Sequence, residues 1–307
     1  MNKKLLAALV AMSVATTANA ETTIYGKVNV SWQSADEGEY NELELRNNAS
    51  RLGFKGTEDL GNGLTAIYQL ETGVNFDDKG SFSKRNTFIG LKGNFGTVRA
   101  GYFDTPTKSA QGKVDLFNDM EGDIATTLTT NDVRAQNSVA YTTPSSSPVA
   151  VNVQVVNKEE ADANTGVSVS GTYTGGGLYV ALGYDQDVYS NESNALRAVG
   201  IYTLGAVQLG LLVEKSEDDA VVDNDAENGF LASIQYNAND AWALKAQYGT
   251  SDIKFVDGKS LSVGADYKLA KNFKLQGYIT QNEGTTRDDQ PAEIDNTYVG
   301  VGAELKF

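Results

Sequence analysis

Apolar and polar residues alternate along most of this chain with a period of two. Between Thr22 and Gln33 the even positions carry most of the apolar side chains, whereas Lys27, Asn29 and Ser31 stand at odd positions. The same alternation recurs in the segments 64–73, 149–155, 178–184, 207–213, 242–248, 261–267 and 299–307. Successive side chains of a β-strand point to opposite faces, so the pattern predicts strands and an all-β chain.

The connections between these segments alternate between short and long. Short connections, such as 58–63 and 93–96, are rich in the residues that form hairpin turns. Long connections, such as 35–48, 104–131 and 282–296, are polar. The predicted strands begin near Thr22, Ser50, Leu64, Arg85, Gly96, Asp132, Val149, Gly166, Leu178, Ala195, Val207, Gly229, Trp242, Lys259, Phe273 and Thr297.

An antiparallel series of sixteen strands with long polar loops at one end only is typical of a transmembrane β-barrel. Such a sheet must close on itself, because hydrocarbon leaves no partner for an unpaired backbone group. We therefore predict a barrel with short periplasmic turns and long extracellular loops. A soluble β-sandwich or a secreted β-solenoid is the alternative, although strict alternation of loop lengths and the lack of a short fixed repeat disfavour both.

The first twenty residues have the composition of a secretory signal. Lys3 and Lys4 precede an apolar run from Leu5 to Ala15, and Ala18 and Ala20 provide the small residues of a cleavage site. The apolar run is too short to cross a bilayer. We predict a signal peptide at residues 1–20 and a barrel domain at residues 21–307, exported to the outer membrane of the cell.

Composition excludes several classes of function. The chain has 25 basic and 40 acidic residues, and its formal net charge of −15 argues against nucleic-acid binding. It has no Cys and no His, which removes thiol nucleophiles, most catalytic triads and most transition-metal sites. We expect no enzyme, no cofactor and no metal site. A barrel lipase or protease would lack its usual base.

Three segments carry a resemblance to a known family. The stretch from Ser50 to Leu64, with the residues 66–71 that follow it, looks like the signature of Gram-negative general porins. The stretches 85–101 and 137–141, the latter with Pro144 behind it, are similar to two further blocks of that family. The terminal Phe307, preceded by alternating apolar residues, is similar to the signal that barrel-assembly machinery reads.

The resemblance implies a homotrimer in outer-membrane lipid and lipopolysaccharide, with Phe307 recognised by the assembly machinery. It also implies that the third long loop, residues 104–131, folds inward as a constriction. Sixteen tilted strands enclose a bore of about 32 Å, which side chains alone cannot fill. Since no plug domain is visible in the sequence, we expect a water-filled lumen.

The charges near this loop suggest how the constriction works. We predict that acids on the loop face bases on the wall and set up a field across the narrowest section, along which polar solutes align. A solvated loop residue is the alternative for each acid, and a salt bridge that holds the loop is the alternative for Arg51 and Arg99. Arg85 is left out because its face of the strand is uncertain. The loop acids are Asp104, Asp115, Asp119, Glu121 and Asp123, and the wall bases are Lys27, Arg51, Lys55, Arg99 and Arg134.

The expected function is a porin for passive diffusion of ions and small hydrophilic solutes. Removal of the signal leaves 23 basic against 40 acidic residues, a net charge of −17, which predicts a mild preference for cations. A substrate-specific channel is the nearest alternative, although no aromatic track marks the lumen face. An adhesion or recognition barrel that uses acidic outer loops is a second alternative.

Overall fold

The computed structural model describes residues 21–307 apart from 39–40, 78–79, 160–162, 219–225 and 288–289. The predicted signal peptide, residues 1–20, lies outside the described residues. The described strands are β1 (Glu21–Asp36), β2 (Asn41–Asn47), β3 (Arg51–Gly61), β4 (Leu64–Val74), β5 (Phe82–Gly93), β6 (Gly96–Asp104), β7 (Arg134–Thr142), β8 (Val149–Val156), β9 (Gly166–Gly175), β10 (Leu178–Gln186), β11 (Ser193–Leu204), β12 (Val207–Asp218), β13 (Glu227–Asn237), β14 (Trp242–Ser251), β15 (Val256–Ala270), β16 (Phe273–Thr285) and β17 (Glu293–Lys306).

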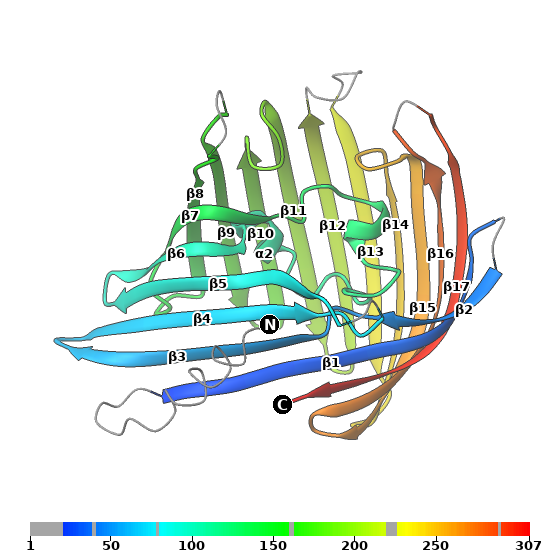
Figure 1. Ribbon diagram of the computed structural model, residues 1–307, viewed down its shortest axis with the longest axis horizontal. Coiled ribbons are helices and arrows are strands. Elements are labelled where there is room, and N and C mark those ends of the chain that lie inside the picture. Colours follow the sequence, from blue (N-terminus) through cyan, green and yellow to red (C-terminus); the bar gives the residue numbers. More distant parts are fainter. Residues whose placement is uncertain (1–20, 39–40, 78–79, 160–162, 219–225, 288–289) are drawn as a thin grey trace.

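The strands form one antiparallel sheet that closes on itself (Figure 1). From β3 onward each strand pairs with the next in sequence, and β1 completes the ring by pairing with β17, from Lys27 opposite Lys306 to Asp36 opposite Thr297. On its other side β1 pairs with β3 along its first part, residues 21–27, and with β2 along its last part, residues 30–36. Because β2 and β3 together act as one wall strand, the described sheet is a barrel of sixteen strands, and the predicted fold is confirmed.

The two faces of the barrel differ in polarity as the alternation predicts. On β1 the inward residues Lys27, Asn29, Ser31 and Gln33 are buried, whereas the outward Trp32 is 54% exposed. Outward Leu, Ile, Val and Tyr side chains are similarly exposed around the whole wall. The barrel is therefore apolar outside and polar within.

One segment predicted as loop is strand. Residues 41–47 belong to β2, where Leu45 lies opposite Trp32 and Leu43 opposite Ser34 on the outward face. The sequence alternates here between outward leucines and inward acidic or basic side chains, a short pattern that the polar composition of residues 35–48 concealed. The wall strand is interrupted between β2 and β3, where Ala49 has a φ of +50°.

The connection between β6 and β7 runs inside the barrel, across the inner faces of the strands β10–β14 (Figure 1). We call residues 105–133 the lumen loop. It contains two short helices, α2 (Pro106–Ala110) and α3 (Ile124–Thr127), whose N-caps are the side chains of Thr105 and Asp123. Neither helix in the described part of the chain is long and apolar enough to cross a membrane.

Candidate functional site

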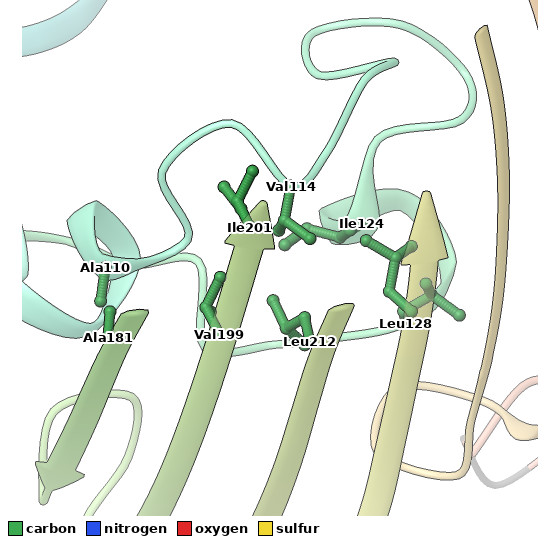
Figure 2. Close-up of a cluster of buried hydrophobic side chains, with 9 residues drawn as sticks. Ala110, Val114, Ile124, Leu128, Ala181, Val199, Ile201 and Leu212 are labelled. Atoms are coloured by element: carbon green, nitrogen blue, oxygen red, sulfur yellow. The ribbon is translucent and has the colours of Figure 1, made fainter. Parts of the chain in front are cut away.

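An apolar contact holds the lumen loop to one side of the wall (Figure 2). Side chains of the loop pack on inward residues of the strands β10–β13, and every member of this cluster is buried. Apolar residues on the lumen face of a porous barrel need a cover, and the loop supplies it. The loop members are Ala110, Val114, Ile124 and Leu128, and the wall members are Ala181, Val199, Ile201, Leu212 and Leu231.

Side chains of the wall also bind the backbone of the lumen loop. A loop outside the sheet needs partners for its carbonyl groups, because buried backbone groups without hydrogen bonds are costly. Four wall side chains each donate a hydrogen bond to one loop carbonyl. These bonds run from Tyr179 to Ala110 (2.9 Å), from Ser233 to Val114 (2.6 Å), from Ser251 to Leu128 (2.6 Å) and from Asn282 to Glu121 (3.0 Å).

Gln247 on β14 makes three hydrogen bonds to the loop. Its amide oxygen accepts from the Leu116 N–H at 2.7 Å, and its amide nitrogen donates to the Asp115 carboxylate and the Gly122 carbonyl, each at 3.0 Å. These contacts join the two ends of the segment 115–123, which we call the loop tip. The Gln247 side chain therefore fixes the position of the loop tip relative to β14.

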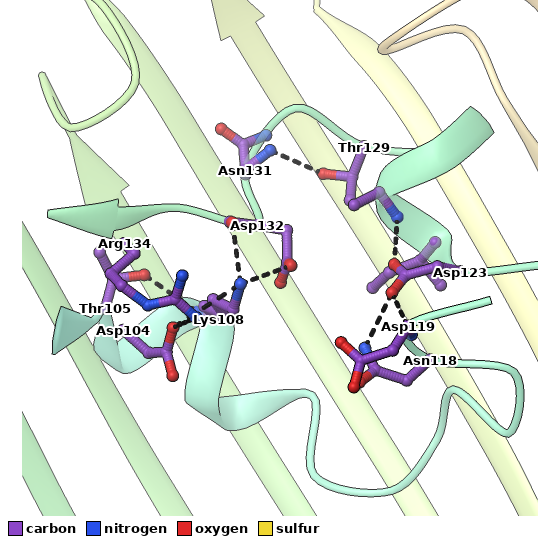
Figure 3. A network of polar contacts seen from close by, with 12 residues as sticks. Asp104, Thr105, Lys108, Asn118, Asp119, Asp123, Thr129, Asn131, Asp132 and Arg134 are labelled. Carbon is purple, nitrogen blue, oxygen red and sulfur yellow. Dashed lines mark hydrogen bonds and ion pairs between the residues drawn. The ribbon is translucent and has the colours of Figure 1, made fainter. Parts of the chain in front are cut away.

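Two of the predicted acids shape the loop tip from within. Asp115, 8% exposed, accepts from the backbone N–H groups of Phe117 and Ile124, both at 3.0 Å. Asp123 caps α3 and accepts from the N–H of Asp119 at 2.7 Å (Figure 3). Burial raises the pKa of Asp115 to about 6, and burial together with the neighbouring Asp115 raises the pKa of Asp123. Neither acid contacts a predicted wall base.

Two further predicted acids, Asp119 and Glu121, do reach the wall. Asp119 lies 2.5 Å from the Lys27 ammonium and 3.7 Å from the Arg51 guanidinium. Although burial opposes it, the Lys27 charge and hydrogen bond hold the pKa of Asp119 below its usual value. Glu121 lies 3.0 Å from Arg46 on β2, and burial raises its pKa. The tip acids thus meet cations of the strands β1–β3.

Asp104 lies elsewhere, where the lumen loop leaves the sheet (Figure 3). Its carboxylate is 2.9 Å from the Arg134 guanidinium and 3.6 Å from the Lys108 ammonium, and it accepts a 2.7 Å hydrogen bond from the Asn86 amide. Lys108 also pairs with Asp132 at 2.7 Å. Within the described residues, the ion pairs and hydrogen bonds of this group join the two ends of the loop and include neither Asp119 nor Glu121.

Two of the predicted wall bases, Lys55 and Arg99, contact neither Asp119 nor Glu121. The Lys55 ammonium lies 5.0 Å from the centre of the Tyr25 ring, and the Arg99 guanidinium lies 4.5 Å from the centre of the Phe103 ring. Both are cation–π geometries. Of the five predicted bases, the structure therefore brings Lys27 and Arg51 to the loop tip, and Arg134 to the origin of the loop.

An open space of about 540 Å³ separates the loop tip from the wall formed by β2–β5. We call it the passage. Its charged lining consists of Arg46, Arg85 and Lys254 on one hand, and Asp119 and Asp123 on the other. Serine, threonine and asparagine side chains add further polar groups, and Met120 and two alanines are the apolar members, so the lining is mainly hydrophilic.

Sequence reasoning missed the three cations of the passage. The alternation within residues 41–47 could have placed Arg46, which lies opposite Ser31 and so faces inward. Arg85 belongs to a bulge of β5, in which Arg85 and Asn86 together oppose Glu71, and its guanidinium lies 2.7 Å from the Glu71 carboxylate. Lys254 stands in a connection between β14 and β15, and its ammonium donates to the Ala125 carbonyl. No periodic signal marks such a position.

Comparison with known proteins agrees with this architecture. The model of the Gram-negative porin family matches residues 6–288. Major outer membrane protein P.IB of Neisseria lactamica is 30% identical, with 99% of this chain and 89% of that protein covered. Outer membrane porin protein 32 of Delftia acidovorans is 29% identical, with 91% of this chain and 89% of that protein covered.

Two solved structures share the fold. An anion-selective porin from Comamonas acidovorans superposes with a TM-score of 0.79 at 24% identity, covering 94% of this chain and all (100%) of that one. The trimer form of OmpT from Vibrio cholerae has a TM-score of 0.70 at 18% identity, covering 94% and 99%. With the family match, the closed barrel and the hydrophilic passage, this chain belongs to the Gram-negative porin family and is a general, non-enzymatic channel of the outer membrane.

Proposed function

We propose that ions and small hydrophilic solutes diffuse passively through the passage between the loop tip and the wall of β2–β5. The observation that carries this proposal is the 540 Å³ space itself, lined by charged and polar groups beside a loop that is fastened to the opposite wall. A hydrophilic lining replaces part of the hydration of a solute as it passes. An apolar solute gains nothing in return for displacing ordered water.

The paired charges at the loop tip orient polar solutes. Asp119 and Glu121 stand on the loop side, and Lys27, Arg51 and Arg46 stand on the wall side. The dipoles of these pairs lie across the direction of diffusion, so a polar solute is turned as it enters the narrow section. This supports the predicted transverse field for two of the five loop acids.

In two of the three ion pairs at the loop tip the cation is more exposed than the carboxylate, whereas in the Lys27–Asp119 pair the carboxylate is more exposed (19% against 5%). The Arg46 side chain is 45% exposed against 5% for Glu121, and Arg51 is 25% exposed against 19% for Asp119. A diffusing ion is most sensitive to charges where the channel is narrowest, since salt screens distant charges within about 8–10 Å. We therefore propose a weak preference for anions, set by the passage. The mild cation preference predicted from the net charge stays a prediction.

Reversal potentials in planar bilayers under a salt gradient decide between these two signs. The wild type should carry slightly more anion than cation current, and the double variant Arg46→Gln, Arg51→Gln should shift toward cations. Lys215→Gln, at an exposed position on β12, serves as the matched control. A wild-type channel that prefers cations, with no shift in the double variant, would contradict the proposed anion preference and assign the selectivity to the acids of the outer loops.

The assembly predicted from the resemblance is part of the same proposal. We propose a homotrimer, embedded in outer-membrane lipid and lipopolysaccharide and inserted by machinery that reads Phe307. The Phe307 side chain is 57% exposed on the outer face, while its backbone exchanges two hydrogen bonds with Gly26 (2.9 and 3.1 Å). Crosslinking of the purified protein in detergent tests the trimer.

A further inference from the structure

A buried ion pair lies behind the lumen loop, away from the passage. The Arg197 guanidinium on β11 is 2.5 Å from the Glu214 carboxylate on β12, and the two side chains are 0% and 1% exposed. Neither residue lines the passage. The residues have no role in the diffusion pathway proposed above, so their burial calls for a separate explanation.

The pair binds both limbs of the lumen loop at one point. On the outgoing limb, an Arg197 Nη donates to the Thr107 carbonyl at 3.5 Å. On the returning limb, Arg197 donates to the Thr129 hydroxyl at 3.3 Å. Glu214 accepts from the Thr129 hydroxyl at 2.5 Å and from the Asn131 amide at 2.9 Å (Figure 3 shows these two loop residues).

Attachment alone does not explain a pair of charges at this place. Val199 and Leu212 stand two residues away on the same strands and already hold the loop through apolar contact (Figure 2). Replacing a buried ion pair by apolar side chains of similar size is often neutral or stabilising. The ion pair adds directionality, because its hydrogen bonds form only when particular loop atoms lie at particular positions.

Little water reaches the pair. The free space that Glu214, Thr129 and the neighbouring leucines enclose is about 10 Å³, room for one water molecule at most. The hydrogen bonds between the pair and the loop are therefore not exchanged for bonds to solvent. Loop and wall can slide past each other only by leaving buried charges without partners, which is costly.

We propose that Arg197 and Glu214 are positioning residues that fix the register of the lumen loop on the wall and thereby the dimensions and charge geometry of the passage. This inference rests on the passage as the route of diffusion. When Thr107 and Thr129 are held at this pair, Asp119 and Glu121 reach the cations of β1–β3. Without the pair the loop keeps its other contacts with the wall, those of Gln247 included, but Thr107 and Thr129 are no longer held at fixed positions, and the tip acids shift with the limbs that carry them.

The test replaces the pair by Arg197→Met, Glu214→Met and asks whether the loop loosens while the barrel stays closed. The chain has no cysteine, so Thr127→Cys provides a single reporter at a loop residue that is 1% exposed and whose hydroxyl makes no hydrogen bond. In the Met variant the reporter should react with a small thiol reagent about tenfold faster or more, because reaction of a buried group follows local opening. Lys215→Met, Glu217→Met replaces an exposed ion pair on the same strand and should leave the rate unchanged.

Single-channel recording gives the second measurement. The Met variant should show several conductance levels and a shifted reversal potential, whereas its heat-modifiable mobility on gels should match that of the wild type. Should the Met variant fail to fold, Arg197→Lys keeps the charge beside Glu214 but loses the two contacts with the loop, and it should change both readouts in the same direction. Folded variants with wild-type reaction rate and a single wild-type conductance would overturn the proposal. The thiol rate does not depend on the route of solutes, so failure of the proposed pathway would leave it unaffected.

Discussion

Lys27 and Asp119 stand 92 positions apart in the chain, yet the ammonium of one lies 2.5 Å from the carboxylate of the other. This pair joins the first strand of the barrel to the tip of the lumen loop. Lys27 is 4% exposed, so the contact is little screened by solvent. The pair therefore joins the wall to the loop tip beside the passage, which Asp119 itself lines.

Neutralising the tip acids should change ion selectivity. Asp119→Asn with Glu121→Gln leaves Lys27, Arg51 and Arg46 without their carboxylate partners, so the wall side of the passage becomes more positive. We expect the ratio of anion to cation permeability, measured as a reversal potential, to rise severalfold. Glu217→Gln on the outer end of β12 is the control. Unchanged selectivity in the double variant would remove both acids from the constriction.

Gln247→Leu should loosen the loop tip. The substitution removes the three hydrogen bonds to residues 115, 116 and 122 and leaves buried groups of the tip without partners. We expect a loss of about 2–4 kcal/mol in the free energy of unfolding, measured by guanidinium denaturation in detergent. Gln235→Leu, on the neighbouring strand, interacts with Asn237 and should cost under about 1 kcal/mol. Equal losses in the two variants would contradict the role of Gln247.

Gly26 should be required for closure of the barrel. A Cβ atom at this position would lie 2.4 Å from the Phe307 ring and 2.9 Å from the Arg51 carbonyl oxygen. Gly26→Ala should therefore destabilise the seam between β1 and β17 by about 1–3 kcal/mol, as overpacking does. Gly200→Ala is the matched control, because nothing lies within 4 Å of its Cβ position. Refolding into detergent, followed by heat-modifiable mobility, compares the two; similar yields would refute this role.

Asp115 should make the protein more stable at pH 5 than at pH 7. Burial raises the pKa of this carboxyl to about 6, above its ordinary value in the unfolded chain. The folded state therefore binds a proton more readily between about pH 4 and 6, and unfolding becomes harder as the pH falls through this window. Between pH 7 and pH 5 this carboxyl contributes about 1 kcal/mol, and Asp115→Asn should remove that contribution, while the raised pKa of Asp123 continues to act in the same direction. The depressed pKa of Asp119 acts in the opposite direction, but only below its ordinary value. An unchanged pH dependence in the Asn variant would rule Asp115 out as the source.

The wall of the barrel could be predicted well because period-two alternation is a local signal. Strands that begin at Leu64, Gly96, Val149 and Phe273 begin where the alternation places them. The errors lie where alternation is short or interrupted. β2 is seven residues long, and the bulge at Arg85 and Asn86 changes which side chains of β5 face the lumen.

The candidate site could be predicted only in part, since its contacts join distant segments. Composition identified Asp119 and Lys27 as an acid and a base on the correct sides, but it could not separate them from Asp115, whose carboxylate binds its own loop. Arg197 and Glu214 have the parity of lumen residues, yet nothing local shows that the loop covers them. Such roles depend on how the lumen loop crosses the wall, which alternation does not encode.

The asymmetric attachment of the lumen loop has a consequence for engineering this channel. Since the loop covers the inner faces of β10–β13, the proposed route of solutes runs along a single side of the cylinder, next to β2–β5. The cut-off size can therefore be retuned from a handful of adjacent positions. Mutations across the covered half would act only indirectly, by displacing the loop that forms one side of the opening.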